Sequence, residues 1–356
     1  VNDGPAGVRP STSRLPGAAA CKSLIGPCAR SAHNPAMTQR FNAAAAHAAP
    51  VLLDKAATLA RACALIAEAG RSDVRLLGFA ETFVPGYAYW LGLYPPVAQH
   101  EVMLEYAAQS VVVAAGELDA VQAACAKHRV NVVLGLSERD GGTLYNSQAF
   151  IDEQGCLLGV RRKLQPTLSE RSVWGQGDGS TLKVYDMPVG KVGGLICGEH
   201  SMNLARHALI LQHEQIHVSS WPTFATMQGN AGWFDSHVDA LSKVHAYTGS
   251  CFVIVAQDPV TQANLDAIEH RLGPQGVLGV GGARSAIYGP GEDFVAPPHT
   301  GLEEKLVIGE IDLDRIQAAK LQHDSAGHYA RSEILRLVVD TEPKTPLIAM
   351  KKPVKD

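Results

Sequence analysis

The sequence predicts a layered α/β protein with mixed β-sheets, and three observations lead to this prediction. Of the 356 residues, 46% are hydrophobic and 19% are charged, which is typical of a chain that buries a large core. From Met37 onward, apolar runs of strand length alternate with stretches in which apolar residues recur at helical spacing. Several of the strands pair as hairpins, which favours mixed sheets over a purely parallel one.

The first half of the chain contains several predicted strands and two helical regions. The segment VRLLGFA has the unbroken apolar character of a buried strand, and a turn at residues 152–155 joins two later strands as a hairpin. The predicted strands are residues 43–49, 74–80, 131–136, 143–151 and 156–160. The predicted helices are residues 55–69 and 100–128, the second in two pieces.

The second half repeats this alternation. Residues 182–186 and 191–196 form a predicted hairpin around a turn at residues 188–190. Further predicted strands are residues 216–220, 252–256, 284–288 and 306–311. The predicted helices are residues 203–213, 231–247 and 315–322. Residues 258–282 show little periodicity, so we expect a loop there.

The composition divides the chain into three parts. Residues 1–36 are rich in Pro, Gly, Ser, Ala and Arg and contain Asp3 as the only acidic residue. We expect them to form a disordered extension, although a transit peptide shares this composition. Residues 37–340 then form one domain, and residues 341–356 a C-terminal tail.

Charge, hydropathy and cysteine usage exclude several classes of protein. The net charge of −4 argues against binding to nucleic acid, which usually requires a basic surface. No apolar run approaches the roughly 18 residues of a membrane helix, so no membrane contact is expected. The seven cysteines are odd in number and scattered, which favours reduced thiols in the cytoplasm over a disulfide scaffold.

A reactive residue stands at the end of a predicted buried strand in GGLICGEH. Cys197 closes this strand, and a helix is predicted a few residues later. Amide groups at a helix N-terminus favour a thiolate and can stabilise developing negative charge. The alternative interpretation is a structural cysteine, since free cysteines are among the most buried residues.

Two further candidates stand in similar positions. Glu81 ends the strand of FAETFVPGY, where partial desolvation raises a carboxylate pKa toward that of a useful general base. Lys163 follows a strand in RRKLQPTLSERSVWGQGDGS and can lower the pKa of a nearby thiol or stabilise an anionic intermediate. Taken singly, Glu81 also fits a capping role, and Lys163 fits a basic surface run.

One motif points to different chemistry. His213 to His217 spells HExxH, which binds zinc when both histidines lie on one face of a helix. The predicted helix ends near Glu214, and a strand is predicted from Ile216, so the two side chains should diverge. The glycine cluster at residues 279–282 has no strand–helix frame and does not predict a nucleotide site.

Taken together, the stretches around Glu81, Lys163 and Cys197 resemble the Glu-Lys-Cys catalytic set of the nitrilase superfamily, in the usual order. The resemblance covers residues 41–340, and IHVSSWP and Gly327-His328-Tyr329 are similar to the nitrilase branch in particular. It implies a four-layer αββα sandwich with two mixed β-sheets, without metal or organic cofactor. It also implies a homodimer that assembles into larger oligomers.

The resemblance further implies roles for individual residues. Cys197 would be the nucleophile, Glu81 the general base and acid, and Lys163 the electrostatic stabiliser, with Glu170 orienting the lysine and the attacking water. We expect the residues of these motifs that flank the catalytic set to contact the substrate. They are Tyr87, Gly198, Trp221 and Pro222.

The expected reaction converts a small-molecule nitrile into a carboxylic acid and ammonia through a cysteine thioimidate and a thioester. The alternatives are a superfamily amidase, a nitrile or cyanide hydratase that releases amide, and an inactive binding protein. Nitrilases usually have Trp directly after the nucleophile, whereas this chain has Gly198. This departure affects the expected substrate range and the ratio of acid to amide.

Overall fold

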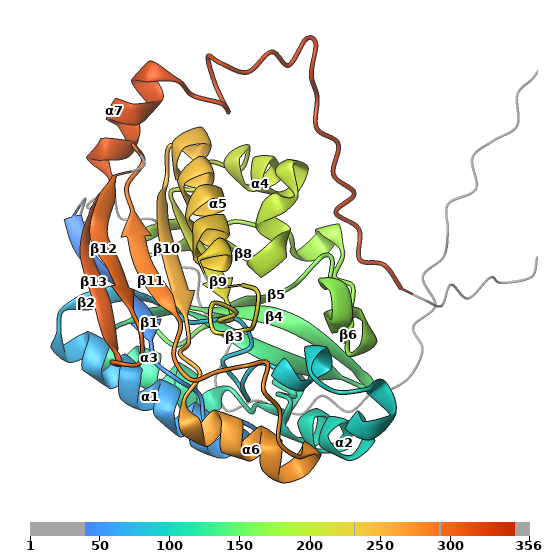
Figure 1. Cartoon of the computed structure of the whole chain (residues 1–356). Coiled ribbons are helices and arrows are strands. Elements are labelled where there is room, and N and C mark those ends of the chain that lie inside the picture. The colour runs from blue at the N-terminus through green and yellow to red at the C-terminus, as the bar shows by residue number, and fades with distance from the viewer. Residues whose placement is uncertain (1–39, 231, 292, 346–356) are drawn as a thin grey trace, which may run out of the picture. The chain divides into compact units, whose positions relative to one another are not determined.

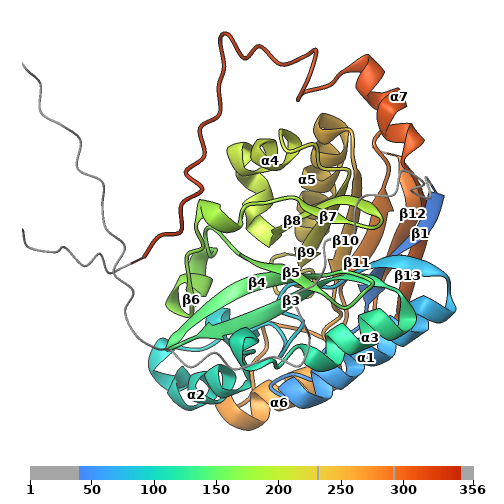
Figure 2. The ribbon, with the colours of Figure 1, turned by 180° about the vertical axis from the view of Figure 1, so that it is seen from behind.

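Two β-sheets pack face to face, and helices cover the outer face of each (Figures 1 and 2). The computed structural model describes residues 40–230, 232–291 and 293–345. The layers follow the order helix, sheet, sheet, helix, so the predicted αββα sandwich with two mixed sheets is confirmed. The predicted extension at residues 1–36 and most of the predicted tail lie outside the described residues.

The first sheet has seven strands, in the order β13-β1-β2-β3-β4-β5, with β6 beside β4. Strands β1, β2 and β3 run parallel, and the pairs β1–β13, β3–β4 and β4–β5 are antiparallel. The bounds are β1 (Arg40–His47), β2 (Val74–Gly78), β3 (Asn131–Asp140), β4 (Thr143–Ile151), β5 (Leu157–Arg162), β6 (Trp174–Gly175) and β13 (Lys305–Asp312).

The second sheet has six strands, in the order β12-β11-β10-β9-β8-β7. Strands β8, β9 and β10 are parallel, and the outer pairs are antiparallel. The bounds are β7 (Tyr185–Met187), β8 (Gly190–Ile196), β9 (Ile216–Trp221), β10 (Phe252–Gln257), β11 (Arg284–Tyr288) and β12 (Phe294–Thr300).

The helices bury one face each against a sheet. Helices α1 (Lys55–Arg71) and α3 (Asp119–His128) cover the first sheet, and α4 (Asn203–Ile210) and α5 (Trp233–Gly249) cover the second. Helices α2 (His100–Gln109), α6 (Gln262–Leu272) and α7 (Asp314–Gln322) complete the set. No helix within the described residues is both long and apolar enough to cross a membrane.

The core between the sheets consists of apolar side chains that alternate along the strands. Because successive strand residues point to opposite faces, each central strand contributes residues both to this layer and to the layer under the helices. Leu76 of β2 lies in the inter-sheet core, whereas its neighbour Leu77 packs toward α1 and α3. Residues from both sheets that meet in the inter-sheet core include Val133, Phe150, Val218, Ile254 and Ile287.

Most predicted elements are confirmed, one predicted loop is wrong, and strands β6 and β12 have no counterpart among the predictions. The expected loop at residues 258–282 contains α6, in which the Thr261 hydroxyl caps the N-terminus by accepting from Asn264 N, and Leu265 and Ile268 are buried. Strand β12 was not predicted. Its sequence FVAPPHT contains two prolines, which sheets tolerate on edge strands such as this one.

A close backbone contact brings the chain after β2 alongside β3. A Cβ atom at Gly135 of β3 would lie only 1.9 Å from the carbonyl oxygen of Ala80. The N–H of Val84 donates to the carbonyl of Gly135, so the segment containing Glu81 runs along β3. Only glycine permits this approach, and the approach determines where Glu81 lies.

We therefore expect Gly135→Ala to destabilise the protein by roughly 1–3 kcal/mol, because the added methyl group must displace backbone. Chemical denaturation followed by circular dichroism measures this change. Gly142→Ala is the matched control, since no atom lies within 4 Å of its Cβ position and its stability should barely change. Equal stability of the two variants would contradict the proposed packing constraint.

Candidate active site

Three segments that are far apart in the sequence converge at the ends of their strands. Glu81 follows β2, Lys163 directly follows β5, and Cys197 directly follows β8. The carboxylate oxygens of Glu81 and Glu170 and the sulfur of Cys197 lie within 4.8 Å of one another. The structure thus brings together all four residues that the sequence selected as catalytic.

The Lys163 ammonium is held between two carboxylates. Its Nζ donates to Oε1 of Glu81 and to Oε2 of Glu170, each at 2.7 Å. Burial alone lowers the pKa of Lys163, but the charges of Glu81, Glu170 and Cys197 outweigh this effect and raise it. Lys163 therefore remains a cation although its side chain is fully buried.

Glu170 is itself held in place. The Tyr87 hydroxyl donates to its Oε1 at 2.9 Å, and the backbone N–H of Thr167 donates to its Oε2 at 2.8 Å. Thr167 and Glu170 form a capping box on the short helix at residues 168–172. These contacts hold the Glu170 carboxylate in position to bind the Lys163 ammonium.

Glu81 has one occupied and one free oxygen. Its Oε1 accepts from Lys163 and from Nδ2 of Asn146 at 2.5 Å. Its Oε2 is buried and has no hydrogen-bond partner among the described residues. Burial raises the pKa of Glu81 to about 7, with Glu170 adding to the effect and Lys163 opposing it. A carboxylate with such a pKa and a free oxygen is suited to accept a proton near neutral pH.

Cys197 rests as a thiol. Burial and the charge of Glu81 raise its pKa well above the ordinary value, and the opposing effect of Lys163 is smaller. Lys163 and the Gly198 N–H both lower the thiol pKa, as the sequence predicted, but burial and the charge of Glu81 outweigh them. The residue is 5% exposed. Its sulfur needs a base to become nucleophilic, and Glu81 lies within reach.

Backbone strain occurs in all three of the converging segments. Cys197 has a φ of 49°, Thr82 beside Glu81 has a φ of 43°, and Leu168 between Lys163 and Glu170 has a φ of 47°. Non-glycine residues rarely adopt this left-handed conformation, and β-branched residues such as threonine least of all. Such strain clusters at functional sites, where the surrounding structure maintains it.

Hydrogen bonds between the two sheets hold the strand ends together. The Ser220 hydroxyl, on the second sheet, donates to the carbonyl of Phe79 at 2.8 Å. Nε2 of Gln148, on the first sheet, donates to the Ser220 hydroxyl at 2.8 Å. The backbone N–H of Glu81 donates to the carbonyl of Trp221. These bonds set the distance between the Glu81 segment and the second sheet.

Glu199 connects the lysine segment to the cysteine segment, and the sequence analysis assigned it no role. Its carboxylate forms a bidentate pair with Arg161 at 2.6 and 2.8 Å and accepts from the backbone N–H groups of Leu164 and Ile196. Leu164 follows Lys163, and Ile196 precedes Cys197. The sequence signal that could have identified Glu199 was its place two residues after Cys197 in a buried motif.

The residues expected to contact substrate have structural partners of their own. The Tyr87 hydroxyl binds Glu170, and Trp221 is fully buried, with its indole N–H on Ser219. Pro222 is also buried. A Cβ on Gly198 would lie 2.8 Å from the Thr167 hydroxyl, so a larger residue there requires Thr167 to move. Their substrate contacts stay predictions.

Two groups of side chains have the composition of a metal site. In one, Lys163 Nζ already lies between the carboxylates of Glu81 and Glu170, where a metal cation would lie. In the other, Glu214 accepts from His217 and from His245, both at 2.8 Å, as in ordinary hydrogen bonds. In each group, hydrogen bonds within the protein occupy carboxylate oxygens that a metal ion would need.

The HExxH motif does not form a helical zinc site. Helix α4 ends at Ile210, and His217 lies on β9, as the sequence predicted. His213 is exposed and has a φ of 61°, whereas His217 is buried. The two histidines therefore do not share one helical face.

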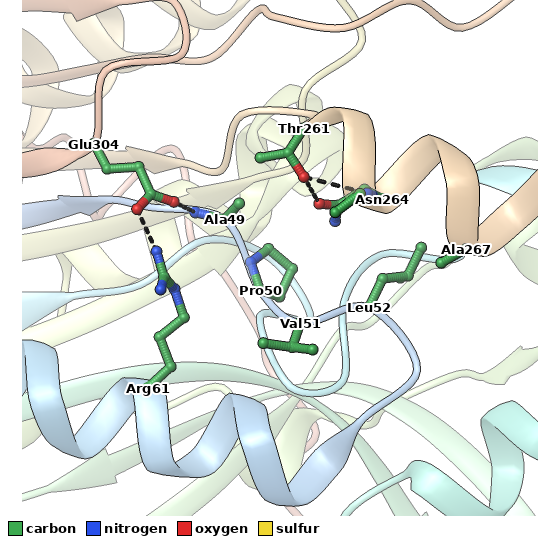
Figure 3. Close-up of a pocket in the computed structure, with 10 residues that line it drawn as sticks. Ala49, Pro50, Val51, Leu52, Arg61, Thr261, Asn264, Ala267 and Glu304 are labelled. Carbon is green, nitrogen blue, oxygen red and sulfur yellow. Dashed lines mark hydrogen bonds and ion pairs between the residues drawn. The ribbon is translucent and has the colours of Figure 1, made fainter.

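A cavity of about 290 Å³ lies apart from this cluster, and Figure 3 shows residues that line it. Glu304 accepts from the backbone N–H of Ala49 and pairs with Arg61 at its rim. The remaining lining is largely apolar and includes Pro50 and Leu52. None of the four candidate catalytic residues lines this cavity.

The sequence is similar to known proteins over most of its length. The sequence model of the carbon–nitrogen hydrolase family matches residues 42–321. A nitrilase from Paraburkholderia phymatum is 38% identical over 311 residues, which cover 87% of this chain and 89% of the relative. An aliphatic nitrilase from Rhodococcus rhodochrous is 36% identical over 313 residues, covering 87% of this chain and 85% of the relative.

Solved structures show the same fold at low sequence identity. A carbon–nitrogen hydrolase from Helicobacter pylori superposes with a TM-score of 0.64 at 18% identity, covering 83% of this chain and 96% of that chain. A Saccharomyces cerevisiae member of the nitrilase superfamily gives a TM-score of 0.58 at 17% identity, covering 82% of this chain and 97% of that chain. These similarities concern the fold alone.

We expect Glu199→Gln to destabilise the protein by about 3–5 kcal/mol, because it leaves the buried Arg161 charge without its partner. It should also slow alkylation of Cys197 by iodoacetamide, since the cysteine and lysine segments lose their common anchor. Chemical denaturation and mass spectrometry measure the two effects.

The matched control is Asp186→Asn, which removes one member of the exposed Asp186–Lys191 pair. Its effect on stability should stay below about 1 kcal/mol. Comparable losses in the two variants would contradict the anchoring role of Glu199.

Proposed function

This chain belongs to the carbon–nitrogen hydrolase family, and from this membership and the site geometry we propose that it is a nitrilase. The reaction adds two waters to an organic nitrile and releases a carboxylic acid and ammonia. Cys197 is the nucleophile, Glu81 the general base and acid, and Lys163 the fixed cation. Glu170 orients Lys163.

The observation that carries this proposal is the different environment of the two carboxylate oxygens of Glu81. One carboxylate oxygen is occupied by Lys163 and Asn146, while the other is buried without a hydrogen-bond partner among the described residues. The free oxygen can therefore accept the Cys197 proton. The sulfur lies within 4.8 Å of the carboxylate, close enough for a small approach to complete the transfer.

The first half of the reaction forms a covalent intermediate. Glu81 removes the thiol proton as the sulfur attacks the nitrile carbon, and it then delivers this proton to the nitrile nitrogen. The product is a thioimidate. Lys163 and the Gly198 N–H stabilise the negative charge that develops on nitrogen during the attack. Because Lys163 stays protonated, this stabilisation is present throughout the cycle.

The second half releases the products. Glu81 activates a water that adds to the thioimidate carbon, and the protonated nitrogen leaves as ammonia. A thioester of Cys197 remains, and a second water hydrolyses it to the acid and the free thiol. If the tetrahedral intermediate expels the thiol instead of ammonia, the product is an amide. We propose mainly acid with some amide.

Gly198 bears on substrate choice. Nitrilases usually have Trp at this position, and its absence removes a large ring beside the nucleophile. The Thr167 side chain occupies part of the direction in which a side chain at position 198 would extend. Thr167 therefore limits the space for the substrate on this side of Cys197.

We also propose that the chain acts as a cytoplasmic homodimer that assembles further. Helices α4 and α5 lie side by side on the outer face of the second sheet (Figure 1). Large apolar side chains on this face are exposed, among them Leu204 of α4 and Val244 and Tyr247 of α5. Exposed apolar patches of this kind mark protein interfaces. Neither nucleic acid nor membrane is proposed as a partner.

A substrate panel tests the proposed reaction. Ammonia and amide release are measured with aliphatic, aryl and arylacetonitriles and with the matching amides. We expect ammonia and acid from at least one nitrile class, and turnover below detection in Cys197→Ala, which deletes the thiol and little volume. Activity on amides alone would make the chain an amidase, and amide as the sole product would make it a hydratase. If no substrate is turned over and Cys197 is not alkylated selectively, the result would support a binding protein.

The pH dependence tests the role of Glu81. Its carboxylate must be ionised to accept the thiol proton, and its pKa is raised to about 7, so activity is lost as the pH falls through this value. We expect kcat/KM to drop about tenfold for each pH unit below the midpoint. Initial rates of ammonia release between pH 5 and 9 measure the profile.

Glu81→Gln is the companion variant, since it keeps the shape of the side chain and removes the base. It should lower kcat/KM by about 100-fold or more at every pH. An acid limb near the ordinary glutamate pKa, or substantial activity of Glu81→Gln, would exclude Glu81 as the base.

A further inference from the structure

Four buried polar side chains lie behind the nucleophile and take no part in the mechanism above. Glu214 precedes β9, His217 lies on β9, and His245 lies on α5. His200 belongs to the short helix that begins at Cys197. All four are at most 1% exposed, so water cannot satisfy them.

A continuous run of hydrogen bonds links these side chains to the nucleophile's own backbone. Glu214 binds Nε2 of His245 and Nδ1 of His217, both at 2.8 Å. Nε2 of His217 lies 3.0 Å from Nε2 of His200. Nδ1 of His200 lies 2.8 Å from the carbonyl oxygen of Cys197. The run therefore ends on the peptide bond between Cys197 and Gly198.

The acceptors at the two ends decide where the protons lie. The Cys197 carbonyl can only accept, so Nδ1 of His200 carries hydrogen. Burial and the neighbouring His217 hold the pKa of His200 well below its ordinary value, so the ring is neutral and its Nε2 is an acceptor. Burial alone would raise the pKa of Glu214, but His217 and His245 outweigh it and lower it to about 2.

His217 consequently has an acceptor at each ring nitrogen, the Glu214 carboxylate and Nε2 of His200. If Nε2 of His217 carried no hydrogen, two nitrogen atoms would face each other with their lone pairs at a distance of 3.0 Å. The Ser219 hydroxyl also binds Nε2 of His200, but it does not remove this repulsion. With Glu214 and His200 as its two neighbours, His217 can donate from both ring nitrogens, and His200 then passes the polarising effect to the Cys197 carbonyl.

The other end of that peptide bond contacts the thiol. The N–H of Gly198 acts on the Cys197 thiol, because it stabilises the thiolate and so lowers the thiol pKa. Hydrogen bonds in a chain polarise one another, so a donor on a peptide carbonyl strengthens the N–H of the same peptide. We propose that Glu214, His217 and His200 are positioning residues that strengthen the Gly198 N–H toward the sulfur and toward the charge developing on the substrate.

This inference rests on the proposed role of Cys197 as nucleophile, and it deepens that role. It differs from simple packing because its effect reaches the thiol through one peptide group. The charged and titratable groups that interact with the thiol directly are Glu81, Lys163, Glu170, Tyr87 and Tyr89. None of them belongs to the run, so its members can be changed while these groups are retained.

Two matched substitutions in the full-length protein test the proposal. His217→Asn retains an amide near the Nδ1 position, able to bind Glu214, but loses the donor to His200. His245→Gln retains an amide near the Nε2 position, able to bind the same Glu214, and leaves the run to Cys197 intact. Each replaces one buried histidine by a neutral amide, so losses from packing alone should be similar.

The measurement is the rate of Cys197 alkylation by iodoacetamide between pH 6 and 10, which needs no nitrile and is independent of the substrate. We expect His217→Asn to slow alkylation by about five- to tenfold at neutral pH and to move its midpoint upward, equivalent to somewhat under one pKa unit. His245→Gln should stay within about twofold of the parent. Nitrile kinetics should show a matching fall in kcat with KM unchanged.

Equal slowing in the two variants would show that the run is only structural, and no slowing in either would overturn the proposal. If His217→Asn does not fold, His200→Asn provides the same test, because its amide retains a donor to the Cys197 carbonyl but cannot accept from His217. A histidine ¹⁵N spectrum of the parent protein is the second measurement. A neutral His217 ring at pH 7 would also overturn the proposal.

Discussion

The site depends on one buried cation. The Lys163 ammonium has no access to solvent, so it can remain charged only because Glu81 and Glu170 each accept a hydrogen bond from it at 2.7 Å. Removing both carboxylates would leave an uncompensated buried charge, at a cost of several kcal/mol. The same cation holds Glu81 in place and lowers the energy of negative charge nearby. Structure and chemistry therefore rely on the same three side chains.

The architecture brings these charges together because strand ends from two sheets meet there. Glu81 and Lys163 follow strands of the first sheet, and Cys197 follows a strand of the second. Glu199 connects the last two through Arg161 and two backbone N–H groups, and Ser220 connects the sheets. Each of these polar groups is buried and hydrogen-bonded, as a low-dielectric interior requires. The sandwich thus acts as a rigid frame whose contacts determine the catalytic distances.

The protonation states follow from the same burial. Desolvation raises the pKa of Cys197, which keeps it a thiol, and raises the pKa of Glu81 to about 7, which makes its carboxylate a stronger base. The run of hydrogen bonds from Glu214 ends on the carbonyl of Cys197 and includes neither Glu81 nor Lys163. Its charges are separated from the reaction by one peptide group. Buried polar groups therefore act on both the backbone carbonyl and the thiol of Cys197.

The sequence by itself determined the kind of fold, because hydrophobic periodicity is a local signal. It also selected Glu81, Lys163 and Cys197 as candidates by their places at strand ends, and Glu170 through the family resemblance. Only the tertiary structure decided what those signals cannot contain: the free oxygen on Glu81, the thiol state of Cys197 and the anchoring by Glu199. It also revealed α6 and the proline-containing edge strand β12, whose local patterns are weak. Protonation and anchoring depend on burial and on partners distant in sequence, and these exist only once the chain has folded.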